Sequence, residues 1–151
     1  MIYKVFSTPA GWIKLTEDQD FLVKLELLDG RIEGSQDSVL LDEAEKQLQA
    51  YLRGDLQTFD LPLKFHGTDF QKKVWKALQT IPYGETRLYK QIAAVIGNEK
   101  ASRAVGGANN KNPLPILIPC HRVVGSHGRL VGYSLGLDVK KQLLALEGIE
   151  L

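Results

Sequence analysis

The hydrophobic pattern of this chain changes its period once, and that change limits the folds available to it. Before residue 62, apolar and polar residues alternate over 3–6, 12–15 and 21–27. Such a two-residue period is typical of strands with one face on a core. After residue 68, apolar residues recur every three or four positions, the period of an amphipathic helix. We therefore expect an α/β domain over 1–61 and a mainly α domain over 62–151.

The first of these segments predicts a small antiparallel sheet with one helix. The turn-forming stretches Pro9-Ala10-Gly11 and 17–20 separate the three expected strands. A helix is expected after them, and Gly54 lies where it should end. Its inward face is predicted to carry Leu41, Ala44, Leu48 and Leu52.

The second segment is expected to begin with a helix, because Thr68 and Gln71 have the spacing of an N-terminal capping box. After a break at 81–84, two more helices are expected, the first from Thr86 to Gly97 and the second after Asn98. The inward residues of this pair are predicted to be Leu88, Ile92, Val95 and Ile96, then Ala101, Ala104, Val105 and Ala108. Two short helices around a glycine turn are typical of a helix-turn-helix motif for DNA, although such pairs are also common packing units. A last helix is expected over 138–147.

Charge is divided unevenly along the chain, although the net charge is only +1. Residues 1–61 carry six basic and twelve acidic side chains, whereas residues 62–151 carry thirteen and six. Between Lys100 and Leu137 there are five basic residues and no acidic residue. A local excess of this kind indicates a polyanionic partner. The face that the last helix of the pair turns outward is expected to carry Lys100, Arg103, Gly107 and Lys111.

The single cysteine lies between an apolar segment and a glycine-rich loop. Residues 114–118 are expected to form a short buried strand or an extended segment that leads into Pro119-Cys120-His121-Arg122. A lone cysteine is most often a small buried hydrophobe. Here, however, the basic neighbours are expected to lower the thiol pKa and to favour a reactive thiolate.

Composition excludes several other kinds of protein. One cysteine and three histidines are too few for a typical structural zinc site, and one cysteine makes no internal disulfide. We expect neither a metal nor another cofactor. No apolar stretch approaches the roughly 20 residues of a membrane-spanning helix, and the N-terminus lacks a signal-peptide pattern. A cytoplasmic protein without membrane contact is expected.

Several motifs occur together from residue 81 onwards, and in this order they resemble the C-terminal domain of the O6-alkylguanine-DNA alkyltransferases. They are Ile81-Pro82-Tyr83-Gly84, Tyr89, Arg103-Ala104-Val105-Gly106-Gly107-Ala108, Asn112-Pro113, Pro119-Cys120-His121-Arg122-Val123-Val124, Gly132-Tyr133-Ser134 and Leu146-Glu147-Gly148. The first 61 residues resemble the ribonuclease-H-like domain of the same family only in their strand and helix pattern. The resemblance also implies that residues 62–151 form a domain with a winged-helix or helix-turn-helix motif for DNA.

This resemblance implies direct DNA repair, in which an alkyl group moves irreversibly from O6-alkylguanine, or from O4-alkylthymine, to Cys120. The damaged base is flipped out of the duplex, because a buried thiol does not reach it in the stack. The implied catalytic residues are Cys120, His121, Glu147, Asn112 and Tyr89. The implied substrate-binding residues are Ser134, Tyr133 and Val123. The implied DNA-binding residues are Arg103, Ala104, Gly106, Gly107, Lys100 and Lys111.

The implied roles divide the reaction between nucleophile and leaving group. His121, oriented by Glu147, takes the thiol proton through a water, and Asn112 holds the turn of the site. Tyr89 and Ser134 donate hydrogen bonds to the departing guanine. Arg103 fills the place of the flipped base.

The expected partner is alkylated double-stranded DNA, bound by a monomer that is able to assemble along the duplex. Two other functions fit parts of the sequence. A non-catalytic DNA-binding protein for damage signalling or transcription would use the helix pair, and Cys120 would then be dispensable. A cysteine hydrolase would use Cys120 with His121, but it also needs an oxyanion hole and turnover.

Overall fold

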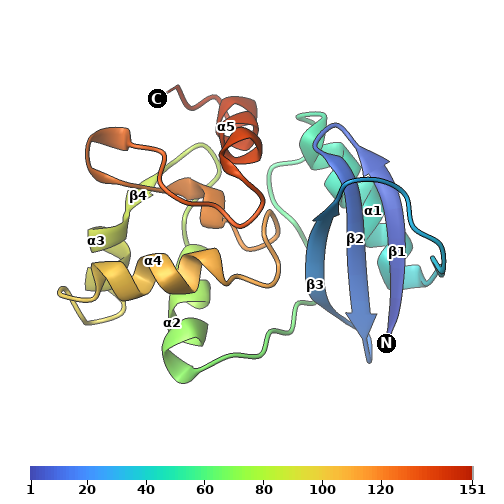
Figure 1. Cartoon of the computed structure of the whole chain (residues 1–151), viewed down its shortest axis with the longest axis horizontal. Coiled ribbons are helices and arrows are strands. Elements are labelled where there is room, and N and C mark those ends of the chain that lie inside the picture. Colours follow the sequence, from blue (N-terminus) through green and yellow to red (C-terminus); the bar gives the residue numbers. More distant parts are fainter. Residues whose placement is uncertain (151) are drawn as a thin grey trace. The chain divides into compact units, whose positions relative to one another are not determined.

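The computed structural model describes residues 1–150, which form two compact units, Met1–Phe65 and the chain from His66 onwards (Figure 1). The division falls four residues after the boundary expected from the hydrophobic period. Residues 62–64 continue the first unit because they pair with its sheet: Leu22 N donates to Pro62 O at 2.9 Å, and Lys64 N donates to Leu22 O at 3.0 Å. No helix among the described residues is long and apolar enough to cross a membrane.

The N-terminal unit is a three-stranded antiparallel sheet with one helix, as the alternating pattern predicted. Strands β1 (Ile2–Thr8), β2 (Gly11–Asp18) and β3 (Phe21–Leu28) lie in sequence order. Helix α1 (Val39–Leu52) begins at an N-cap serine, Ser38, and packs on β1 and β2. The core between sheet and helix is apolar, and its fully buried side chains include Ile13, Leu15, Leu22, Leu41 and Leu48.

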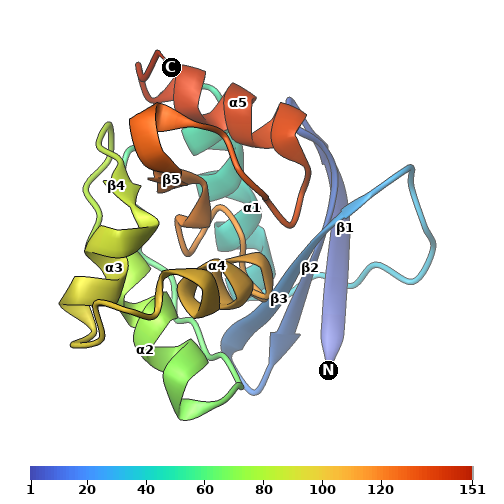
Figure 2. The same cartoon turned by 60° about the vertical axis from the view of Figure 1, so that its left-hand side comes forward.

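The C-terminal unit is mainly helical and holds every predicted site residue. Its elements are α2 (Asp69–Leu78), β4 (Arg87–Leu88), α3 (Tyr89–Val95), α4 (Ser102–Asn110), the 3-10 turn η1 (Cys120–Arg122), β5 (Val123–Val124), a second 3-10 turn η2 (Ser126–Gly128) and α5 (Leu137–Leu146). Helix α4 packs on both α2 and α3 (Figure 2). The capping box of Thr68 and Gln71 at the start of α2 is confirmed.

The helix pair α3–α4 is present but differs from the expectation in detail. Helix α3 begins at Tyr89, three residues later than predicted, because 87–88 pair in parallel with 123–124. The predicted inward positions of Val95 and Ala104 were wrong, since both side chains are exposed. Each lies on the outward side of a short helix, where the neighbouring helices offer no surface to cover it.

The apolar segment 114–118 is buried as expected, but it forms a turn and neither of the predicted alternatives, a strand or an extended segment. Asn112 closes a turn around it: its Nδ2 donates to Ile118 O at 2.9 Å, and its Oδ1 accepts from Leu114 N at 2.9 Å. Ile116 has a left-handed backbone with φ of 76°. Pro115 within the segment, like Pro113 before it and Pro119 after it, lacks the N–H group that a strand would need, and the side chain of Asn112 supplies pairing instead.

Candidate active site

The parallel pairing of β4 with β5 brings two distant parts of the chain together. Strand β4 leads directly into α3, whose first residue is Tyr89, and β5 follows the turn that begins with Cys120. Cys120 is completely buried, at 0% exposure. A short two-residue ladder thus places a phenol and a thiol in the same part of the C-terminal unit.

Burial decides the state of the Cys120 thiol. It raises the thiol pKa to about 11, against the opposing effects of a hydrogen bond with Asn112, the positive charge of Lys140 and a hydrogen bond with Tyr133. The expectation of a lowered pKa was therefore wrong. The adjacent Arg122 is neutralised by a carboxylate, and desolvation of a thiolate outweighs the remaining positive charge. The resting protein holds a protonated thiol.

A buried ion cluster lies directly after the cysteine. His121 Nε2 is 2.7 Å from Glu147 Oε2, and both side chains have no exposed surface. Arg122 contacts the same carboxylate through Nε at 2.9 Å and through a terminal nitrogen at 3.1 Å. Gly84 N donates to Glu147 Oε1 at 3.0 Å, and Arg122 donates to Ile81 O at 2.7 Å. The Ile81-Pro82-Tyr83-Gly84 stretch therefore holds this cluster in place.

The cluster fixes the protonation of His121. Burial alone raises the pKa of the Glu147 carboxyl, but the hydrogen bonds from His121 and Arg122 overcome it and lower the pKa to about 2. Burial lowers the pKa of His121, although Glu147 opposes this effect. At neutral pH the imidazole is thus neutral, and its Nε2 carries the hydrogen that faces the carboxylate. Its Nδ1 is then the nitrogen able to accept a proton.

Lys140 is a site residue that the sequence did not predict. It is 0% exposed, and its Nζ donates to the carbonyl oxygens of Val123 at 2.7 Å, Gly132 at 3.2 Å and Val131 at 3.3 Å. Burial lowers its pKa to about 8, and the charge of Cys120 opposes that change. One signal was present in the sequence: Lys140 precedes Leu143 and Leu144 by three and four residues, so it shares their inward face.

A hollow of about 280 Å³ lies beside the helix pair. Its walls come from α3, α4 and the loop before α5, and its lining residues are Tyr89, Ser102, Arg103, Gly106, Asn110, Val131 and Gly132. The Tyr89 hydroxyl donates to Val131 O at 2.8 Å. Burial raises the pKa of Tyr89, as does the charge of Cys120, while a hydrogen bond from Asn109 lowers it.

The other predicted residues are divided between surface and interior. Val123 and Tyr133 are buried near the cysteine, whereas Ser134 is exposed on the loop before α5. The predicted DNA-contacting side chains Lys100, Arg103, Ala104 and Lys111 are all exposed, as is Gly107. No group of three or more His, Cys, Asp and Glu residues able to hold a metal occurs within residues 1–150.

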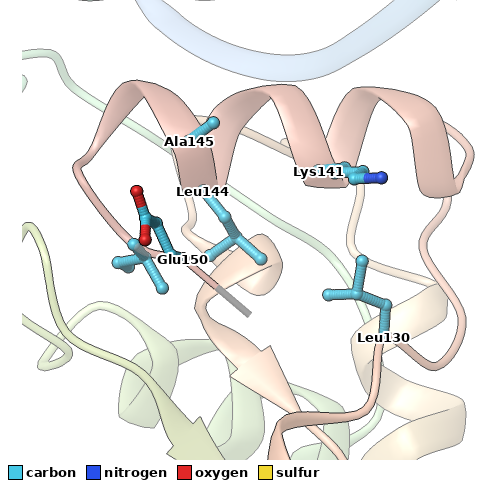
Figure 3. A pocket seen from close by; sticks show the side chains of 6 residues that line it. Leu130, Lys141, Leu144, Ala145 and Glu150 are labelled. Atoms are coloured by element: carbon cyan, nitrogen blue, oxygen red, sulfur yellow. The ribbon is translucent and has the colours of Figure 1, made fainter.

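A second, larger hollow of about 380 Å³ lies beside α5 and the residues after it, and none of the predicted site residues lines it (Figure 3). Its lining residues are Leu130, Lys141, Leu144, Ala145, Ile149 and Glu150.

Comparison with known proteins agrees with this arrangement of two units. Residues 1–65 match the family model of the 6-O-methylguanine DNA methyltransferase ribonuclease-like domain, and residues 69–149 match that of the DNA-binding domain of the same protein. The methylated-DNA--protein-cysteine methyltransferase of Methanosarcina acetivorans is 50% identical over 98% of this chain and 99% of its own. The chain belongs to this family.

Solved structures of 6-O-methylguanine DNA methyltransferases have the same fold. The Mycobacterium tuberculosis O6-methylguanine methyltransferase superposes with a TM-score of 0.87 at 45% identity, covering 97% of this chain and 92% of its own. Mycobacterium tuberculosis OGT in complex with DNA gives a TM-score of 0.90 at 46% identity, with the same coverage. The expected fold class, a ribonuclease-like α/β domain followed by a DNA-binding domain, is confirmed.

Proposed function

We propose that this protein repairs DNA by moving an alkyl group from O6-alkylguanine to its own Cys120, once per molecule. One observation carries the proposal: a fully buried thiol lies directly before a buried His121–Glu147 pair, in the unit that bears the α3–α4 helix pair. Two close relatives support it, because one is named a methylated-DNA--protein-cysteine methyltransferase and the other was solved in complex with DNA. The cytoplasmic location and the monomeric state stay predictions.

The nucleophile is activated only when it is needed. Nδ1 of the neutral His121 takes the thiol proton through a bridging water, and Glu147 stabilises the imidazolium that forms. The sulfur of Cys120 then attacks the alkyl carbon, and the bond from that carbon to O6 breaks. The hydrogen bonds of Asn112 and Tyr133 and the charge of Lys140 stabilise the thiolate during this step. A high resting pKa protects the thiol from oxidation between encounters with damage.

The leaving group takes the electron pair of the broken bond, so the site must supply a proton or hydrogen bonds to it. Tyr89 faces the hollow beside α4 and gives its hydroxyl hydrogen to N3 of the guanine. Ser134, on the exposed loop, donates to O6 when that loop meets the base. Val123 and Tyr133 form part of the pocket wall. Guanine departs neutral, and the thioether on Cys120 has no means of release.

Recognition of DNA rests on α4. Its outward side is free of acidic residues and presents Arg103 and Gly107, with Lys100 before the helix and Lys111 at its end. The lysines meet phosphates, and the small residues Ala104 and Gly106 let the helix backbone approach the duplex. Arg103, on the rim of the hollow, fills the place that the flipped base leaves.

The test compares three proteins on two substrates. Wild type, Cys120→Ser and Arg103→Ala are each mixed with a duplex that contains O6-methylguanine, and with free O6-benzylguanine, and are then weighed intact. We expect wild type to gain one alkyl group from either substrate and Cys120→Ser to gain none. Arg103→Ala should be slowed far more on the duplex than on the free base. Transfer to Cys120→Ser would overturn the proposed chemistry, and equal slowing on both substrates would overturn the role of Arg103.

A further inference from the structure

Asn109 is a fully buried amide whose hydrogen bonding is incomplete. It lies near the end of α4 at 0% exposure, and its Nδ2 donates to the carbonyl oxygen of Cys120 at 3.3 Å. Its Oδ1 is buried and has no hydrogen-bond partner among residues 1–150. A buried acceptor without a donor is uncommon in folded proteins, so this one calls for a physical reason.

The carbonyl group of Cys120 fixes which way this amide faces. A carbonyl oxygen only accepts, so the side chain must present its NH₂ group there; the reversed amide would set two acceptors against each other. The Asn109 amide also lowers the pKa of the Tyr89 hydroxyl, as a hydrogen-bond donor directed at the phenol oxygen does. Such a bond is donated by the amide, because a phenolate oxygen only accepts.

This orientation decides where Tyr89 sends its single hydroxyl hydrogen. Because Asn109 acts on the phenol oxygen as a donor, the hydroxyl hydrogen is left for another acceptor, which is Val131 O at 2.8 Å on the wall of the hollow. A reversed amide would offer Oδ1 to the hydroxyl and capture that hydrogen inside the protein. The unpaired Oδ1 of Asn109 is thus the cost of keeping the hydrogen of Tyr89 directed at the hollow.

We propose that Asn109 is a positioning residue for alkyl transfer: held by the Cys120 carbonyl, its amide keeps the Tyr89 hydroxyl hydrogen directed at the bound base. The role rests on the proposed function and adds a residue to it. When a purine occupies the hollow, its ring nitrogen takes the place of Val131 O as the acceptor. The peptide group of the nucleophile and the acid that serves the leaving group are thereby joined through one side chain.

A double-mutant cycle tests this role. Single-turnover rates of transfer from free O6-benzylguanine, which needs no base flipping, are measured for wild type, Asn109→Leu, Tyr89→Phe and the double variant. In the wild-type background Asn109→Leu should slow transfer roughly tenfold, the effect of losing one well-placed hydrogen bond. In the Tyr89→Phe background it should slow transfer by less than about twofold, because the two residues act as a unit. The exposed Asn98→Leu is the matched control and should keep the wild-type rate.

A purely structural role for Asn109 would slow transfer by the same factor in both backgrounds, and that result would overturn the proposal. Should Asn109→Leu fail to fold, Asn109→Asp keeps the shape of the side chain but loses the donor, and the same cycle applies to it. An unslowed Asn109→Asp would also overturn the role. Failure of wild type to gain the alkyl group would instead reject the proposed function, so the two failures are distinguishable.

Discussion

Two lysines, one in each unit, show how differently the two halves of this protein treat charge. Lys4 in the N-terminal sheet lies at the surface among three carboxylates, with Glu45, Asp42 and Asp37 at 2.7, 2.8 and 3.3 Å, and their hydrogen bonds raise its pKa. Lys140 in the C-terminal unit is fully buried against carbonyl oxygens, and burial lowers its pKa to about 8. The first arrangement favours the folded state, and the second weakens it.

The same contrast extends beyond the lysines. The N-terminal unit buries a single charged side chain, Glu17, within an apolar core. The C-terminal unit buries six polar or charged ones: Asn109, Asn112, His121, Arg122, Lys140 and Glu147. Burying such groups costs free energy that an apolar core would not spend. Proteins keep local costs of this kind at functional sites, which is where these residues gather.

The largest effect on stability is expected where a buried partner is removed. Glu147→Ala leaves Arg122 and His121 without their carboxylate, and breaking a buried pair in this way costs about 3–5 kcal/mol of unfolding free energy. Glu45→Ala removes one half-buried partner of Lys4, which keeps Asp42 and Asp37, and should cost at most about 1 kcal/mol. Urea unfolding of both variants measures the difference. Similar losses of unfolding free energy in the two variants would contradict the claim that the two units treat charged side chains differently.

The second prediction concerns pH, where the two lysines should act in opposite directions. An unfolded lysine keeps its proton up to pH about 10.5, whereas folded Lys140 releases it near pH 8. The unfolded chain therefore binds more protons between these values, and stability rises with pH across that window. A shift of this size, from 10.5 to about 8, corresponds to about 3 kcal/mol. For Lys4, whose folded pKa is raised, the stabilisation is present below pH about 10.5 and is lost as pH rises further.

Comparing each lysine with its methionine variant by urea unfolding at several pH values isolates these contributions. The Cys120→Ser background removes the titration of the thiol from the measurement. We expect the Lys140 protein to gain stability relative to Lys140→Met from pH 8 to 10.5, and the Lys4 protein to show no such gain relative to Lys4→Met. A flat Lys140 difference would mean that the buried amine keeps its proton across this window, as an unfolded lysine does, and would contradict the lowered pKa.

The smallest expected effect follows alkylation itself. Cys120 is fully buried, so a new carbon is added inside packed surroundings, which costs about 1–3 kcal/mol and more for larger groups. The methylated protein should therefore melt below the free protein, and the benzylated protein lower still. The loss should lie in the C-terminal unit, where the turn held by Asn112 and the helix pair meet the cysteine. Thermal melts of samples checked by mass decide this, and unchanged melting of both adducts would show that the pocket holds the group without strain.

Local periodicity was sufficient to predict the sheet and the helices, and the spacing of Thr68 and Gln71 was sufficient to predict the capping box. It failed where tertiary pairing overrode it: the β4–β5 ladder delays α3 to Tyr89, and the side chain of Asn112 turns 114–118 into a loop. The sequence motifs identified the residues around Cys120 and Glu147 but not their pKa values. The positive neighbours of the thiol were visible in the sequence, whereas its burial and the pairing of Arg122 with Glu147 arise from contacts distant in the chain.

Lys140 and Asn109 were missed for a related reason. Each lies at an inward position of its helix. A lysine or an asparagine is not predicted to be buried there, however, unless its hydrogen-bond partners are known. For both residues those partners are main-chain oxygen atoms, which carry no signature in the sequence.

The stoichiometry of the reaction tests the central claim most directly. The protein is titrated with an increasing excess of duplex that contains O6-methylguanine, and the methyl groups transferred per chain are counted by intact mass and peptide mapping. Because the thioether on Cys120 is not released, we predict a plateau at one methyl group per chain, all of it on Cys120, with no further loss of methylated DNA. Continued loss of methylated DNA after the plateau, or methyl groups on another residue, would contradict the account.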